Sequence, residues 1–158
     1  MVSDTHLTAD RLDRLPAQVT EAAAAADVIL HAGDVVCTEL LDVLGTHAPV
    51  HAVLGNNDRG LDGVLPDRLV VQLEGVVVAM VHDSGARTGR PARLRRWFPD
   101  ADLVVFGHSH EPVAECDGDR WLVNPGSPTQ RRRQPNPTFA VVDLAHGRVA
   151  AVDHVVVR

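Results

Sequence analysis

The 158-residue sequence contains little cysteine, few aromatic residues and no long apolar run. Its two cysteines, Cys37 and Cys116, lie in no C-x-x-C pair, which argues against a disulfide framework or a zinc knuckle. The longest uncharged apolar stretch, 76–81, is far shorter than the roughly 20 residues that a membrane span needs. No basic start followed by an apolar core marks a signal peptide. We therefore expect an intracellular, cytoplasmic protein that does not enter the membrane.

Lysine is absent, and all 15 basic residues are arginine. The formal net charge is -6 with the histidines neutral, which argues against nonspecific nucleic-acid binding through a large basic surface. With 45% hydrophobic and 23% charged residues, the composition is that of an ordinary globular protein. A chain of this length is expected to form one domain over residues 1–158 and to bury roughly 70% of its unfolded surface.

Short apolar runs alternate with helical patterns in the first half of the chain. Strands are expected at 1–2, 28–30 and 50–54, with helices over 10–26 and 38–45 between them. This alternation predicts a parallel sheet. Because only two residues precede Ser3, the first strand is expected to be weak for a central strand, and a start upstream of Met1 is left open.

The second half is richer in strands. A hairpin is expected from 68–73 and 76–81 around Glu74-Gly75, followed by a helix over 88–98. Further strands are expected at 103–106, 112–116, 120–123, 138–144 and 148–157. Helices first and strands later predict two stacked sheets with helices outside. The one long loop, 125–137, is of a length that is usually functional or mobile.

Metal-binding side chains follow five of the apolar runs. They are Asp4 and His6, Asp34, Asn56, His82, and the pair His108 and His110. Loops at the carboxyl ends of strands converge on one rim of an α/β sheet, so residues far apart in sequence can meet there. Carboxylates, an amide and imidazoles without a thiolate suit Mn²⁺, Fe or Zn²⁺. The set is large enough for two ions, and Asp34 is the expected bridge because Gly33 lets the backbone approach closely.

The order and content of these motifs resemble the calcineurin-like metallophosphoesterase superfamily, and within it the small bacterial and archaeal phosphodiesterase branch. The resemblance covers nearly the whole chain. It implies an α/β fold, a four-layer α/β/β/α sandwich of two mixed sheets flanked by helices. It also implies that Asp4, His6, Asp34 and His110 hold one metal, and that Asp34, Asn56, His82 and His108 hold the other. The expected cofactor is two divalent ions, Mn²⁺ first, with Fe, Zn²⁺ or Ni²⁺ as alternatives. The segment 124–127 resembles one near the site in this branch.

Two such ions would clamp phosphoryl oxygens and lower the pKa of a bridging water, whose hydroxide would attack phosphorus in line. The expected activity is therefore hydrolysis of a small phosphodiester. Many superfamily members carry a histidine where this chain has Asn57, which can donate a hydrogen bond but cannot deliver a proton. That departure argues against phosphoprotein phosphatase activity and favours esters with good leaving groups. The expected catalytic residues are Asp34, Asn57 and Asp58, and Asp58 either fixes its loop or acts directly.

Two other functions stay open. The first is a non-catalytic metal-binding scaffold for protein interaction, as in the retromer subunit of this fold, although the complete ligand set favours an enzyme. The second is a phosphomonoesterase or nucleotidase. His31 is either structural or orients a ligand. The run Arg131-Arg132-Arg133 is either a solvated loop or supplies an arginine that clamps a substrate phosphate. Analogy with small relatives also suggests a homo-oligomer.

Overall fold

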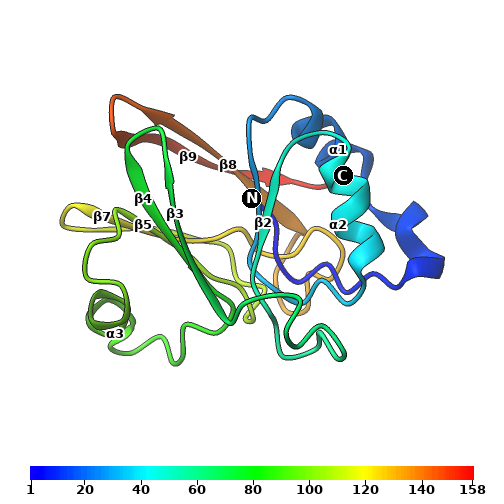
Figure 1. Ribbon diagram of the computed structural model, residues 1–158, viewed down its shortest axis with the longest axis horizontal. Coiled ribbons are helices and arrows are strands. Elements are labelled where there is room, and N and C mark those ends of the chain that lie inside the picture. Colours follow the sequence, from blue (N-terminus) through cyan, green and yellow to red (C-terminus); the bar gives the residue numbers. More distant parts are fainter.

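Two β-sheets lie face to face, with helices on their outer sides, in the computed structural model, which describes residues 1–158 (Figure 1). In the first sheet, β1 (Ile29–His31) pairs in parallel with β2 (Val50–Ala52), and β8 (Thr138–Ala145) pairs antiparallel with β9 (Arg148–Val156). The opening residues join these two pairs. Val2 bridges His31 in parallel, and Met1 exchanges both main-chain hydrogen bonds with Ala140, at 2.7 and 3.0 Å. The short opening segment therefore lies in the middle of a mixed sheet.

The second sheet has five strands in the order β3-β4-β5-β7-β6. The three central strands, β4 (Val76–Val81), β5 (Leu103–Val105) and β7 (Arg120–Asn124), run parallel to one another. The edge strands β3 (Arg68–Leu73) and β6 (Val113–Asp117) are antiparallel to their neighbours. Burial follows this order, because β4 and β5 are almost wholly buried whereas β3 alternates between exposed and half-buried residues.

The helices are short. They are α1 (Ala17–Ala24), α2 (Thr38–Gly45) and α3 (Arg90–Trp97), together with a 3-10 helix, η1 (Ala9–Arg14). The expected helix over 10–26 is wrong, because the chain leaves the helical conformation at Leu15-Pro16 and resumes as α1. Proline lacks the N–H of a helical hydrogen bond and disfavours helical dihedrals in the residue before it. The other elements end within two residues of their expected bounds.

Three buried apolar clusters separate the layers. One packs α1 and α2 against the first sheet, through residues such as Val19, Leu40 and Ile29. The second lies between the two sheets and includes Leu30 and Val78. The third packs α3 against the far side of the second sheet. The predicted α/β class is confirmed.

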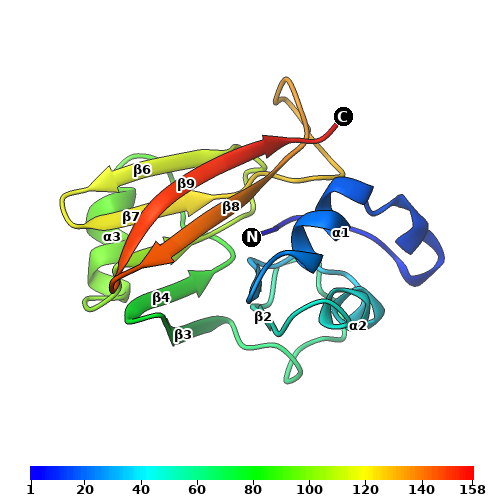
Figure 2. The same ribbon diagram turned by 90° about the horizontal axis from the view of Figure 1, so that it is seen from above.

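The two views agree on where the chain begins. The N-terminus lies beside β8, and β8 and β9 form a long hairpin along one side of the molecule (Figure 2). From Met1 the chain runs towards the loops that follow β1, so the first polar residues reach the carboxyl ends of the strands at once. No helix in this structure has the length and apolar character required to cross a membrane.

Candidate metal centre

All seven predicted metal ligands meet at one rim of the sheets, in the loops that follow the strands. Five of them have left-handed backbone conformations, with φ of 54° at Asp4, 47° at His6, 56° at Asp34, 69° at His108 and 58° at His110. Positive φ is uncommon outside glycine and costs about 1–3 kcal/mol for each residue. Such strain gathers at functional sites, where a fixed side-chain direction matters more than local stability.

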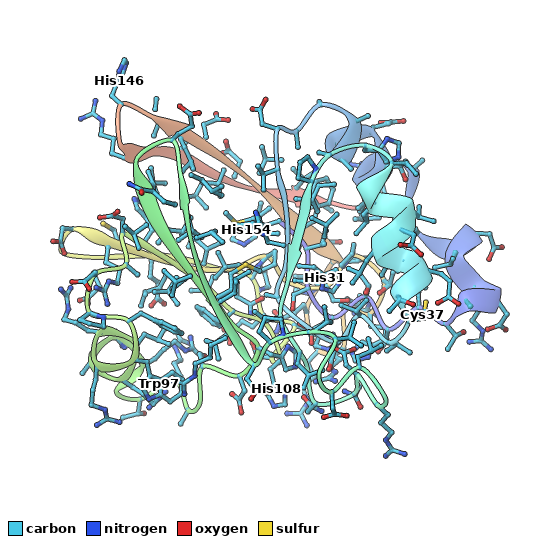
Figure 3. The ribbon with its side chains drawn as sticks, viewed as in Figure 1. His31, Cys37, Trp97, His108, His146 and His154 are labelled. Carbon is cyan, nitrogen blue, oxygen red and sulfur yellow. The ribbon has the colours of Figure 1, made fainter.

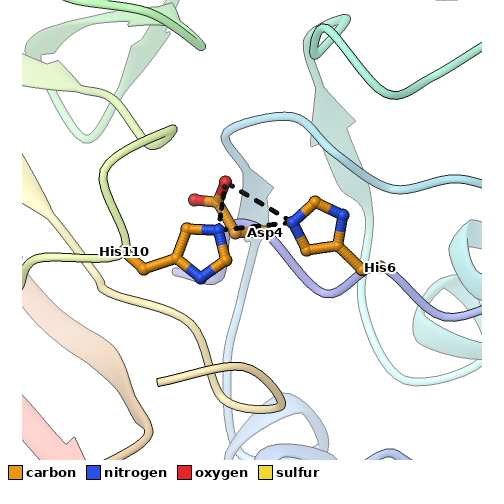
Figure 4. A group of neighbouring side chains, drawn as sticks. All are labelled: Asp4, His6 and His110. Atoms are coloured by element: carbon orange, nitrogen blue, oxygen red, sulfur yellow. Dashed lines mark hydrogen bonds and ion pairs between the residues drawn. The ribbon is translucent and has the colours of Figure 1, made fainter. Parts of the chain in front are cut away.

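The first group of ligand atoms belongs to Asp4, His6 and His110 (Figure 4). The Nε2 atoms of the two histidines lie 3.3 Å apart. The Oδ1 atom of Asp4 lies 3.3 Å from the Nε2 atom of His110 and 4.0 Å from the Nε2 atom of His6. Asp4 is fully buried, yet its Oδ1 atom has no hydrogen-bond partner. A buried carboxylate oxygen facing two imidazole nitrogens is a good fit to a divalent cation.

The second group belongs to Asp34, Asn56, His82 and His108. The Oδ1 atom of Asn56 lies 3.1 Å from His82 Nε2 and 2.8 Å from His108 Nδ1. Asp34 stands between the groups, because its Oδ1 atom lies 3.5 Å from His82 Nε2 and its Oδ2 atom lies 3.5 Å from His6 Nε2. Each oxygen of one carboxylate thus faces a different group, which is the position that a bridging ligand would need.

Hydrogen bonds behind the histidines set which ring nitrogen faces the site. His82 Nδ1 donates to the carbonyl oxygen of Ala32 at 2.7 Å, and His110 Nδ1 donates to that of Gln130 at 2.5 Å. A proton fixed on Nδ1 leaves the Nε2 lone pair free for a metal, as in many histidine-ligated sites. Neither carbonyl could have been identified from the sequence, because both act through the main chain.

Asp58 ties two ligand-bearing loops together. Its carboxylate accepts hydrogen bonds from the main-chain N–H groups of Asp34 at 3.1 Å, Val36 at 2.6 Å and Gly55 at 2.7 Å. Val36, a β-branched residue, has a φ of 78°, and its bond to Asp58 supports that conformation. Asp58 therefore joins the loop after β1 to the loop after β2, and both of its oxygens are engaged by the backbone.

Asn57 holds the central carboxylate. Its main-chain N–H donates to Asp34 Oδ1 at 2.8 Å, and its side-chain Nδ2 donates to Asp34 Oδ2 at 2.6 Å. The main chain and the side chain of Asn57 thus both donate to Asp34, one of the expected catalytic residues. The arrangement orients the carboxylate that stands between the two ligand groups.

Three glycines let the loops approach one another. A Cβ atom at Gly33 would lie 2.6 Å from His82 Nδ1, and one at Gly55 would overlap the main chain and side chain of Asp34. A Cβ atom at Gly107 would overlap the hydroxyl of Ser3. The expected role of Gly33 is confirmed in this sense, because no side chain fits between it and the His82 ring.

The two buried aspartates are ionised. Burial alone would raise the pKa of Asp34, but the nearby His82 ring and the hydrogen bonds from Asn57 outweigh it and hold the pKa below its usual range. Burial likewise opposes ionisation of Asp4, but the nearby rings of His110 and His82 and the hydroxyl of Ser3 reverse the effect, so the pKa of Asp4 is also lowered. Burial alone would lower the pKa of His82, but its contacts with Asp34 and Ala32 have the larger effect, so the pKa is raised. A cation bound here would displace protons from this cluster.

Supporting side chains surround the ligands. Ser3 donates to Asp4 Oδ2 at 2.7 Å, and Ser127 donates to the main-chain oxygen of Asp4 at 2.7 Å. The side chain of Asn124 donates to the carbonyl of Gly107 at 3.0 Å. The 124–127 segment therefore supports the loops that carry Asp4 and His108. Ser3 was missed from the sequence, although its place beside a predicted ligand was a usable signal.

Two open questions from the sequence concern His31 and Arg132. His31 is fully buried, and its Nε2 atom lies 3.0 Å from the Thr5 hydroxyl, which itself donates to the carbonyl of Asp34 at 3.3 Å. It therefore supports the ligand loops from beneath. Arg132 donates to the carbonyl of His108 at 3.1 Å, which holds its guanidinium at the rim of the site. His146, by contrast, lies at the tip of the β8–β9 hairpin, far from His108 (Figure 3).

Sequence comparison identifies relatives across most of the chain. The model of the calcineurin-like phosphoesterase superfamily domain matches residues 1–147. A probable metallophosphoesterase of Methanothermobacter thermautotrophicus is 36% identical over 134 residues, which are 84% of this chain and 77% of the relative. A probable metallophosphoesterase of Methanocaldococcus jannaschii is 36% identical over 135 residues, which are 84% of this chain and 68% of that protein.

Solved structures share the fold. An archaeal phosphodiesterase aligns with a TM-score of 0.77 at 21% identity, covering 98% of this chain and 96% of its own. Vps29 of Entamoeba histolytica complexed with Zn²⁺ aligns with a TM-score of 0.73 at 22% identity, covering 99% and 97%. At such low identity these two alignments show the fold alone. The family match and the two archaeal relatives confirm the resemblance read from the motifs: the chain belongs to the calcineurin-like phosphoesterase superfamily.

Proposed function

We propose that this phosphoesterase is a metal-dependent phosphodiesterase with a dinuclear centre, and that Mn²⁺ is its preferred ion. The observation that carries the proposal is the place of Asp34, whose two oxygens each lie 3.5 Å from a histidine of a different ligand group. When bound, a pair of divalent ions supplies an activated water and neutralises charge on phosphoryl oxygens. The archaeal phosphodiesterase of the same fold supports the choice of reaction.

The ligands divide into two sets around Asp34. Asp4, His6 and His110 would hold one ion together with Asp34, and Asn56, His82 and His108 would hold the other. The carbonyls behind His82 and His110 keep a proton on Nδ1 and so present Nε2 to the site. Asn57 orients Asp34, and Asp58 fixes the distance between the two loops. In this proposal Asn57 and Asp58 act by positioning the ligands.

The absence of a general acid at position 57 limits the leaving groups that the enzyme can expel. Asn57 directs its main-chain N–H and its side-chain amide at Asp34, and an amide cannot deliver a proton to a leaving group. A missing general acid costs about 10² to 10⁴ in rate when the leaving group is poor. We infer that the enzyme acts on diesters whose leaving groups depart without protonation. Arg132, held at the rim by the carbonyl of His108, would contact the substrate phosphate.

A cavity beside the second ligand set would receive one arm of the diester. It has a volume of about 580 Å³ and includes Asn56 and His82 in its wall. The other charged residues of its lining are Asp58, Arg59, Asp62, Asp67, Arg68 and Asp83. Acidic groups outnumber basic ones there, so a neutral or hydroxyl-bearing arm fits better than a second phosphate.

The test is hydrolysis of bis(p-nitrophenyl) phosphate by chelator-stripped protein, before and after Mn²⁺ is restored. We expect turnover only with the metal, and its loss in Asp34→Asn. Asp42→Asn, on the exposed face of α2, is the matched control and should keep full activity. Two bound ions with no turnover of any ester would reject the enzyme and favour a non-catalytic metal-binding scaffold for protein interaction.

A third outcome separates diesterase from monoesterase. If p-nitrophenyl phosphate is hydrolysed faster than the diester, the protein is a phosphomonoesterase or nucleotidase instead. The diesterase is the preferred alternative, because the cavity beside Asn56 and His82 has room for the second ester arm that a monoester lacks. Replacing Mn²⁺ with Zn²⁺, Fe²⁺ or Ni²⁺ at equal concentration tests the choice of ion.

A further inference from the structure

One short segment, 127–132, connects three of the predicted metal ligands to the arginine run at 131–133. It belongs to the long loop between β7 and β8, and its first residue, Ser127, is only 1% exposed. The three arginines are exposed. From Gln130 to Asn136 the loop makes two hydrogen bonds to residues outside it, and both end on predicted ligands. The position of the arginine run therefore depends on the metal centre.

The side chain of Ser127 links this segment to the first ligand loop. Its hydroxyl donates to the carbonyl oxygen of Asp4 at 2.7 Å and accepts from the main-chain N–H of Gln130 at 2.9 Å. A serine hydroxyl has one donor and two acceptor lone pairs, so one buried side chain can do both at once. Ser127 thus fixes Gln130 relative to Asp4, a member of the first ligand group.

Thr129 adds a second link to the same ligand loop. Its hydroxyl donates at 2.6 Å to the carbonyl oxygen of Thr5, which lies between Asp4 and His6 in the chain. The hydroxyls of Ser127 and Thr129 therefore hold two consecutive carbonyl groups of that loop. Neither hydroxyl bonds to a ligand atom, so both residues act on the site through the loop that they hold.

The carbonyl of Gln130 faces the ring of His110. The Nδ1 atom of His110 donates to this carbonyl at 2.5 Å, and the Nε2 atom of the same ring belongs to the first ligand group. A cation at Nε2 withdraws electron density from the ring, and a donor that carries positive charge forms a stronger hydrogen bond. The bond to Gln130 is therefore expected to strengthen when the first ligand group is occupied.

Two residues further on, Arg132 reaches the rim of the site. Its guanidinium donates to the carbonyl oxygen of His108 at 3.1 Å, and its φ of 48° is a left-handed conformation that residues other than glycine seldom adopt. Such strain persists where surrounding contacts fix the conformation, here the bond to His108 and the anchor at Gln130. The other N–H groups of the guanidinium make no hydrogen bond within the chain and are free to bind an anionic oxygen.

We propose that Ser127 and Thr129 are positioning residues that make the place of Arg132 depend on occupancy of the first ligand group. With that group empty, the bond at His110 is weaker and the arginine run leaves the rim more often. With the group occupied, Arg132 is held where a substrate phosphate would bind. Such coupling is reciprocal, so a phosphate bound at Arg132 also raises the affinity for the ion. The inference rests on the proposed metal centre, but its main test needs no turnover.

That test is the rate of trypsin cleavage at 131–133, because a protease needs the arginine run to leave its folded position. We expect saturating Mn²⁺ to slow this cleavage about tenfold in the chelator-stripped protein. Ser127→Ala and Thr129→Val should each reduce the protection to about threefold or less, although both variants still bind the ion. Thr46→Val removes an exposed hydroxyl at the end of α2 and is the matched control, which should keep the full effect.

A double-mutant comparison separates positioning from a merely structural role. In Thr129→Val the arginine run is already displaced, so adding Arg132→Ala should raise KM for the diester less than about twofold, against about tenfold in the wild type. If Thr129 contributed only to stability, the two changes would act on KM independently. A far-UV circular dichroism spectrum like that of the wild type shows that each variant is folded.

Three results would overturn the proposal: cleavage that Mn²⁺ does not slow, protection that survives in both Ser127→Ala and Thr129→Val, and independent effects of Thr129→Val and Arg132→Ala on KM. Failure of the proposed hydrolysis looks different, because Mn²⁺ would still protect 131–133 while no ester is cleaved. A protein that binds no Mn²⁺ in calorimetry would contradict both proposals.

Discussion

Removing the Asp58 carboxylate should loosen the metal centre without touching a ligand. Asp58→Ala leaves three main-chain N–H groups without their acceptor, those of Asp34, Val36 and Gly55. The bonds to Asp34 and Gly55 are buried, and each lost partner costs about 1.5–2 kcal/mol. The hydrogen bond from Val36 is only partly buried, so water can accept from the Val36 N–H in place of Asp58. The expected loss in free energy of unfolding is about 3–4 kcal/mol, which lowers Tm by roughly 10 °C for a domain of this size.

Urea unfolding of the chelator-treated protein measures this loss directly, and calorimetric titration with Mn²⁺ measures the second effect. We expect affinity for the ion to fall about 10- to 100-fold, because the loops that carry Asp34 and Asn56 lose their link. Asp62→Ala, an exposed aspartate nearby, is the matched control and should change stability by less than about 0.5 kcal/mol. If Asp58→Ala keeps wild-type stability and metal affinity but loses turnover, Asp58 acts on the substrate and is not a positioning residue.

Three further predictions concern a close approach, a buried histidine and an arginine. Gly55→Ala should abolish metal binding, because its Cβ would overlap Asp34, whereas Gly45→Ala has open space and should change Tm by no more than a few degrees. His31 has its pKa lowered by burial to about 3, below the unfolded value near 6.5, so the unfolded state binds more protons between these values. Stability of the chelated protein should therefore fall as pH is lowered from about 6.5 to 3, and the slope should be shallower in His31→Gln. Arg132→Ala should raise KM for a diester about tenfold with a smaller change in kcat, and Arg132→Lys should recover part of the loss.

Each of these has a contrary result. Metal binding by Gly55→Ala at wild-type strength would show that the loops can separate without harm. Urea midpoints of His31→Gln that follow the wild-type pH curve would mean that His31 takes up its proton without unfolding. Equal KM values for Arg132→Ala and for Arg148→Ala, a change on the exposed surface of β9, would remove Arg132 from substrate binding.

Local patterns in the sequence were sufficient for most elements. The bounds of α2, β3 and β4 agree with those expected, because a clear apolar run or helical spacing ends at a turn residue in each case. The helix expected over 10–26 was wrong because the apolar spacing continues across Pro16, where the backbone cannot. The apolar spacing indicates which residues are buried, but Pro16 determines the backbone conformation at this point.

The ligand residues were also available from the sequence, since polar side chains after apolar runs mark the carboxyl ends of strands. The division of these ligands into two groups could not be predicted from the sequence. The place of Asp34 between His6 and His82 depends on three loops that meet only after the sheets pack. The same is true of the carbonyls of Ala32 and Gln130, because every residue has a carbonyl and nothing in a sequence says which one will face a histidine.

Residue type and spacing were enough to indicate the family, the order of elements and the seven side chains able to bind metal. Packing was needed to show that Asn57 and Asp58 hold other residues in place. Such hydrogen bonds join segments distant in the chain, so they form only once packing has brought those segments to a fixed distance.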